Sequence, residues 1–217
     1  ESIAAFNLLE SKLGFNEQVI MAREQVYVDA GKIDKAAAEI NKLIEFDPED
    51  TRYYGLMADM YLENGDSVQA LNYYQKVLEI DPKNGFVQFS LAGYYQKMKD
   101  PEKAYEHTRE GFKSESLELD TKLQMFLMIT SNPEQSGISE KQTSELLGLL
   151  RAMYPDDYRV KALYADFLLQ NNQLEEARTQ LRMVLESKKD DYLIWERLLM
   201  VDNDMLDFES LYTDGKL

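Results

Sequence analysis

The chain carries short runs of apolar residues at helical spacing, and a polar turn follows each run. The stretch GDSVQALNYYQKVLEIDPKNG, from Gly65, matches GKIDKAAAEINKLIEFDPEDT, from Gly31, in the order of its apolar and polar positions. Apolar residues recur every three or four positions in both, which predicts an amphipathic helix. The pairs Asp47-Pro48 and Asp81-Pro82 stand 34 residues apart. Since proline cannot continue a helix, the pattern predicts a 34-residue repeat that ends there.

Each repeat holds two helices joined by a short turn. In the repeat with the clearest pattern, Tyr54, Ala58 and Tyr61 line the first helix, and Asp66 is the predicted N-cap of the second. Asp34 is the predicted N-cap at the same place one repeat earlier. We divide the chain, as one continuous domain, into residues 1–16 (the second helix of a truncated upstream repeat), 17–50, 51–84, 85–118, 119–157 (a divergent repeat with a long loop), 158–191 and 192–217 (a partial repeat).

The two ends lack the polar capping helices that an array of repeats requires. Ser2 to Leu13 is expected to be a second helix whose first helix is missing. The sequence is therefore expected to be a segment of a longer array.

The residues Tyr54, Met57-Ala58, Tyr61, Ala70, Tyr74 and Pro82 resemble the tetratricopeptide repeat (TPR). Small residues such as Ala58 and Ala70 suit the place where two helices cross closely. The resemblance covers nearly the whole chain and implies an all-α fold, a right-handed superhelical α-solenoid of antiparallel helix pairs. The character of the sequence is similar to that of bacterial TPR proteins, some of which are attached to the cell envelope.

Three positions depart from the family pattern. Arg23-Glu24 replaces the apolar and small pair of the first repeat, which predicts a helix that is shifted or that faces a lost neighbour. Gly111 falls inside a second helix, and the loop from Ser131 to Ser139 is longer than the other turns.

The resemblance also implies that the first helices line a concave groove in which a peptide or partner protein binds. Met21, Gln25 and Asp59 stand where a clamp for a carboxylate terminus would need Lys, Asn and Arg, so chaperone termini are not expected ligands. The same face continues to Glu196 and Met200 on the last repeat. The expected groove residues are Met21, Gln25, Arg52, Gly55, Asp59, Glu63, Phe86, Phe89, Gly93, Leu123, Arg159 and Asp166.

Two phenylalanines suggest what the groove accepts. Phe86 and Phe89 lie beside the acidic Asp59 and Glu63, which favours an extended or helical peptide with apolar anchors and a basic residue. The alternative is that both rings pack against neighbouring helices. Most of the fourteen tyrosines fall at core spacing and are expected to pack rather than to bind a ligand.

Charge narrows the range of partners. Forty acidic residues against 24 basic ones give a formal net charge of −16, without a basic cluster. We therefore expect no nucleic-acid partner and no attraction to anionic membranes. No apolar run approaches the roughly 20 residues that span a bilayer, so membrane insertion is not expected. A cytoplasmic and a bacterial periplasmic or envelope-associated location fit equally well.

The sequence offers little chemistry for catalysis. There is no cysteine, and the one histidine, His107, has no metal-ligand partner and is expected to be a solvated surface residue. Asp202, Asp204, Asp207 and Glu209 lack the central glycine of a calcium loop and are expected to form a solvated acidic face. We expect no enzyme, cofactor or metal site.

The leading hypothesis is a non-catalytic interaction scaffold. The alternatives are an accessory, substrate-recruiting region of a larger enzyme or envelope assembly, and a self-association module.

Overall fold

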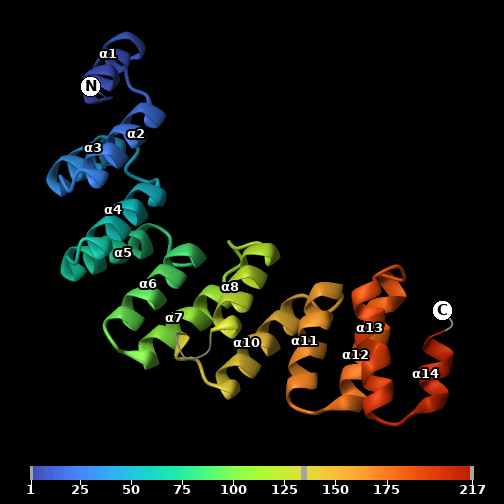
Figure 1. Cartoon of the computed structure of the whole chain (residues 1–217). Helices are drawn as coiled ribbons and strands as arrows, with labels where there is room; N and C mark the ends of the chain where they lie inside the picture. The colour runs from blue at the N-terminus through green and yellow to red at the C-terminus, as the bar shows by residue number, and fades with distance from the viewer. Residues whose placement is uncertain (1, 133–135, 216–217) are drawn as a thin grey trace. The chain divides into compact units, whose positions relative to one another are not determined.

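The computed structural model describes residues 2–132 and 136–215 (Figure 1), with the side chain of residue 2 excepted. Within these residues every regular element is an α-helix, which confirms the predicted all-α helical repeat fold. The helices gather into two compact units, residues 1–118 and 119–217. The expectation of one continuous solenoid stays a prediction.

The first unit consists of a leading helix followed by three helix pairs. The members of each pair, α2 with α3, α4 with α5 and α6 with α7, make the closest contacts in the unit. The helices are α1 (Ser2–Leu13), α2 (Glu17–Asp29), α3 (Ile33–Phe46), α4 (Thr51–Glu63), α5 (Ser67–Ile80), α6 (Gly85–Lys97) and α7 (Pro101–Lys113).

The second unit contains the divergent repeat and the last helices of the chain. Its closest pair is α11 with α12, and α13 contacts both α12 and α14. The helices are α8 (Leu119–Ser131), α10 (Glu140–Met153), α11 (Tyr158–Gln170), α12 (Leu174–Ser187), α13 (Tyr192–Asp204) and α14 (Phe208–Asp214).

Side-chain caps fix where most helices begin. A cap accepts a hydrogen bond from one of the first free backbone N–H groups, as Asp66 does from Gln69 at 3.0 Å. Asp34 is not a cap, contrary to expectation. The helix α3 begins at Ile33, so Asp34 lies in its first turn. The capping residues are Asn16, Asp50, Asp66, Asn84, Asp100, Ser139, Asp157, Asp191 and Asp207.

The core follows the small and large positions of the repeat. Ala58 and Ala70 are fully buried together with Tyr74, so α4 and α5 approach closely at their crossing. Ala165 and Leu181 are buried in the same way in the second unit. Tyrosines contribute to these clusters as expected from their spacing, but Tyr192 is mostly exposed.

Arg23, which stands where the repeat pattern has an apolar residue, is the centre of a buried ion network and does not mark a shifted helix. The Arg23 guanidinium, 2% exposed, donates to Asn7 Oδ1 at 2.9 Å and to Glu10 Oε2 at 2.7 Å, both on α1. It also donates to Glu39 Oε2 on α3 at 2.5 Å. Because three helices share one cation, Arg23 attaches α1 to the first helix pair.

The prediction that Asp202 belongs to a solvated acidic face is wrong, because its carboxylate is fully buried. Arg178 Nη1 lies 3.5 Å from Asp202 Oδ1, but neither carboxylate oxygen accepts a hydrogen bond from a described donor. Burial raises the pKa of Asp202, and the nearby charge of Asp214 raises it further. The ionised form of Asp202 is therefore less favourable in the folded protein than in the unfolded chain.

Asp202→Asn is expected to stabilise the second unit at neutral pH by about 1 kcal/mol, because it removes a buried charge and keeps the shape. Arg178 retains its ion pair with Asp207 at 2.7 Å. A raised folded-state pKa means that wild-type stability increases as the pH falls through it toward the ordinary value of 3.8. Urea unfolding of both proteins across this range should show the difference narrowing on acidification. A constant difference would contradict the assignment.

Candidate functional site

A hollow of about 210 Å³ lies between the first helices of two consecutive repeats. Its walls come from α4 and α6, and Val77 of α5 contributes to the lining. Four of the twelve expected groove residues, Arg52, Gly55, Asp59 and Phe86, line this α4–α6 hollow. The full lining is Thr51, Arg52, Gly55, Leu56, Asp59, Val77, Asn84, Phe86, Val87 and Ser90.

The two phenylalanines of α6 have different roles. Phe86 is 62% exposed and presents its ring to the α4–α6 hollow. Phe89 instead packs edge-to-face on Phe112 of α7, with ring centroids 5.4 Å apart. A Cβ on Gly111 would come within 2.9 Å of the Phe89 ring, so this glycine lets the ring lie against α7. The alternative of packing against a neighbouring helix therefore applies to Phe89 alone.

Gly55 stands in the middle of α4 without a packing reason. A Cβ at this position would meet no atom within 4 Å, and the backbone is in no left-handed conformation that would favour glycine. Glycine inside a helix costs about 0.5–1 kcal/mol relative to alanine. Gly55 thus leaves backbone open to the hollow at a cost in helix stability.

Arg52 is largely neutralised by neighbouring carboxylates. Its Nε and Nη2 donate to the two oxygens of Asp50, at 3.0 and 2.5 Å, and Glu17 of α2 lies 3.7 Å away. The hydrogen bonds from Arg52 lower the pKa of Asp50. Arg52 is therefore engaged within the repeats and leaves little positive charge for an anionic ligand.

Asp59 supplies the negative wall of the hollow. The Tyr74 hydroxyl on α5 donates to Asp59 Oδ1 at 2.5 Å, which fixes the carboxylate in place. Burial raises the pKa of Asp59, and the charge of Glu63 one turn later adds to this effect. A cationic group at the hollow would relieve the repulsion between the two carboxylates.

The other expected groove residues do not line the α4–α6 hollow. Met21 and Gln25 lie exposed on α2, where Gln25 donates to Asp29 at 2.9 Å, and Glu63 and Gly93 lie at the surface of α4 and α6. Their assignment to a partner-binding groove stays a prediction.

Three expected residues lie in the second unit. Leu123 is only 9% exposed, which does not fit the open groove position that the sequence predicted for it. Arg159 bonds to Asp157 and to Asp120, which repeats the arrangement of Arg52. Asp166 pairs with Arg197 at 2.8 Å, and burial raises the pKa of Asp166.

His107 is not the solvated residue that the sequence suggested. It is half-buried, its Nδ1 lies 2.7 Å from Gln88 Oε1, and its ring stacks on Tyr95 at 5.1 Å. Burial lowers the pKa of His107, which favours the neutral ring.

The described residues also bear on metal binding and membrane crossing. Among residues 2–132 and 136–215, no group of three or more His, Cys, Asp or Glu side chains is placed to hold a metal ion. None of the described helices has the length and apolar character needed to cross a membrane.

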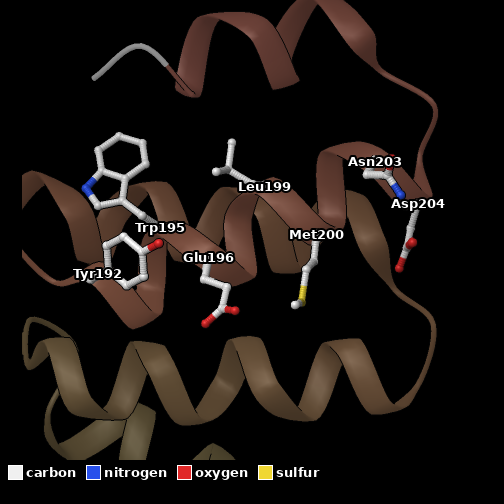
Figure 2. Close-up of a pocket in the computed structure, with 7 residues that line it drawn as sticks. All are labelled: Tyr192, Trp195, Glu196, Leu199, Met200, Asn203 and Asp204. Atoms are coloured by element: carbon white, nitrogen blue, oxygen red, sulfur yellow. The ribbon is translucent and has the colours of Figure 1, made fainter.

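A second hollow, of about 440 Å³, lies along α13 (Figure 2). The sequence pattern placed Glu196 and Met200 on the groove face of this helix. Trp195 is half-buried, and its Nε1 donates to the carbonyl oxygen of Lys189 at 2.7 Å. The lining of this α13 hollow is Tyr192, Trp195, Glu196, Leu199, Met200, Asn203 and Asp204.

Comparison with protein families gives two matches, both to the tetratricopeptide repeat. They cover residues 25–85 and 141–199, together more than half of the chain. A curated relative, tetratricopeptide repeat-containing protein trd-1 of Caenorhabditis elegans, is 24% identical over 194 residues. The match takes in 85% of this chain and 22% of the relative, so the chain spans about a fifth of that protein's length.

The solved structures of three proteins are among those similar to this chain. Pseudomonas aeruginosa PilF is 18% identical with a TM-score of 0.45, over 91% of this chain and 88% of that one. MamA is 16% identical with a TM-score of 0.44, over 78% and 97%. YrrB, described as a TPR protein with an unusual peptide-binding site, is 13% identical with a TM-score of 0.43, over 89% and 97%.

Proposed function

The chain belongs to the tetratricopeptide repeat family, and on that premise we propose that it is a non-catalytic scaffold that holds a peptide of a partner protein. The α4–α6 hollow is the proposed contact point. The observation that carries this proposal is Gly55, a helix-interior glycine that faces the hollow with no neighbour to explain it. A glycine here lets the backbone of a ligand approach α4 closely.

The walls of the hollow indicate the chemistry of the peptide. Phe86 offers an exposed ring for an apolar side chain, and Asp59 with Glu63 favours a Lys or Arg next to it. Arg52 is already paired with Asp50, so a free carboxylate is not the preferred ligand. The proposed ligand is an extended segment with one apolar and one basic residue.

The size of the hollow favours a passing peptide over an enclosed small molecule. Pockets for drug-sized ligands measure about 300–1,000 Å³, and this one is smaller and open. Because the two helices are fixed by the cores beneath them, binding orders little of the protein. One such contact gives modest affinity, and contacts on several repeats raise it.

Gly55→Gln is expected to weaken peptide binding strongly while stabilising the protein. The longer side chain fills the hollow, and replacing a helical glycine adds up to about 1 kcal/mol. Gly148→Gln on α10 is a matched control, because a Cβ added at Gly148 would also meet no atom within 4 Å. Both variants should melt at a higher temperature in circular dichroism.

Peptides selected on the wild-type protein from a random display library provide the ligand for this test. Isothermal titration should show at least about a tenfold loss of affinity, or 1.4 kcal/mol, for Gly55→Gln and none for Gly148→Gln. Equal affinity for all three proteins would show that the peptide binds outside the α4–α6 hollow.

A further inference from the structure

We propose that the α13 hollow is a docking site for a cationic amphipathic helix of a partner protein. This surface lies in the second unit and shares no residue with the α4–α6 hollow. It therefore adds a second binding surface to the scaffold, and its test does not depend on the first one.

The lining residues follow one face of α13. They recur at intervals of three and four positions from Tyr192 to Asp204, the spacing of neighbours on a helix surface. On this face the side chains form two rows that point in opposite directions in Figure 2. One row holds Trp195 and Leu199, and the other holds Glu196 and Met200. The lining of the hollow thus extends along the helix axis from Tyr192 to Asp204.

Apolar side chains occupy both faces of α13. Ile194, Leu198 and Val201 are buried in the core of the second unit. On the open face Tyr192 is 79% exposed and Met200 is 57% exposed. The helix packs on α12 and α14, and neither neighbour covers these two side chains.

The residue types suit protein recognition. Tyrosine and tryptophan are rigid anchors that are common at binding hot spots. Methionine adapts its shape to different apolar partners. Trp195 is already fixed by its hydrogen bond to Lys189, so one wall of the hollow is preformed.

Two acidic residues define the charge of the partner. Glu196 and Asp204 lie at the two sides of Met200, eight residues apart on one helix face, or about 12 Å at 1.5 Å per residue. Throughout the part of the chain that the structure describes, no Lys or Arg pairs with either carboxylate, and no Lys or Arg lines the hollow. By contrast, nearby Asp166 is paired with Arg197.

Charge complementarity therefore selects a basic partner. A helix with two Lys or Arg residues two turns apart, and apolar residues between them, would place its cations on Glu196 and Asp204 and its apolar face on Met200. Helix-in-groove recognition reads anchors at this periodicity. The net charge of −16 attracts such a cation from a distance and speeds its association.

The test uses a synthetic fluorescein-labelled helical peptide with Lys at positions i and i+8 and Leu at i+3, i+4 and i+7. A second peptide carries Glu in place of both lysines. Fluorescence anisotropy with the full chain should show binding of the lysine peptide, weakening as ionic strength rises, and no binding of the glutamate peptide.

Charge reversal at the site should exchange the two specificities. Glu196→Lys with Asp204→Lys is expected to lose at least about tenfold in affinity for the lysine peptide and to bind the glutamate peptide. Glu175→Lys with Glu186→Lys, on exposed positions of α12, makes the same change in net charge and should stay within about threefold of wild type. Circular dichroism should confirm equal helicity of the variants.

Three outcomes would overturn the proposal. Equal losses in both double variants would reveal diffuse attraction to an acidic protein. Unchanged affinity of Met200→Ser would exclude the apolar contact. Self-association of the wild type in sedimentation, lost only in Glu196→Lys with Asp204→Lys, would assign the face to a second copy of the chain. Gly55→Gln should still bind the lysine peptide with wild-type affinity, and this result distinguishes a failure of this proposal from a failure of the first.

Discussion

Arg23→Ala is expected to lower the stability of α1 to α3 by about 3 kcal/mol, because truncation leaves the buried Glu39 carboxylate without its closest cation. Lys42 remains 3.1 Å from Glu39 and keeps the effect at the lower end of the range for broken buried pairs. Since repeats unfold in part independently, hydrogen exchange of the amides in α1, α2 and α3 is the measurement. Amides of α11 to α13 serve as the internal reference.

A double variant separates the effect of the charge from the effect of packing. Arg23→Met with Glu39→Gln removes both buried charges and keeps the volume, so it should cost much less than Arg23→Ala. The wild type should also lose protection in acid. The hydrogen bond from Arg23 lowers the pKa of Glu10, so its contribution is complete above the ordinary value of 4.5 and is lost as the pH falls through the lowered value. A pH-independent difference between wild type and Arg23→Ala would contradict this account.

Gly85→Ala is expected to destabilise the α6–α7 pair by about 2 kcal/mol through overpacking. An added Cβ would lie 2.5 Å from Leu117 Cγ and 2.8 Å from Ser114 Cβ, both in the segment that follows α7. The Gly85 N–H also donates to Ser116 Oγ at 3.1 Å, so the two segments cannot separate freely. Thermal unfolding monitored by circular dichroism reports the loss.

Gly93→Ala is the matched control, because it lies in the same helix with open space at its Cβ and should be neutral or stabilising. Adding Leu117→Ala to Gly85→Ala should restore part of the lost stability, since the clash then has no partner. A double variant that is less stable by the full sum of the two single effects would show that the clash is not the cause.

Periodicity was enough to predict the helices because most of them bury apolar residues at helical spacing. The pairs around Ala58, Ala70 and Tyr74 pack as their spacing indicates. Polar residues at apolar positions could not be interpreted in the same way. Arg23 meets Glu10 and Glu39 only because three helices turn toward one point, and the sequence does not contain those rotations.

The candidate site shows the same limit on a smaller scale. Phe86 and Phe89 are three residues apart and equally apolar, yet one is exposed and the other packs on α7. Gly111 is the residue in the sequence that could have distinguished the two rings. Because it has no side chain, it leaves room on α7 for the ring of Phe89. Leu123 was misplaced because a groove position and a packed position differ by a fraction of a helical turn.

The arginines at the start of α4 and α11 have a mechanical consequence. Arg52 joins Glu17 of α2 to Asp50 before α4, and Arg159 joins Asp120 of α8 to Asp157 before α11. Each is an exposed tie between one repeat and the next, and salt weakens such ties. Within each unit we therefore expect neighbouring repeats to separate somewhat more readily in concentrated salt, while the apolar cores continue to hold them together.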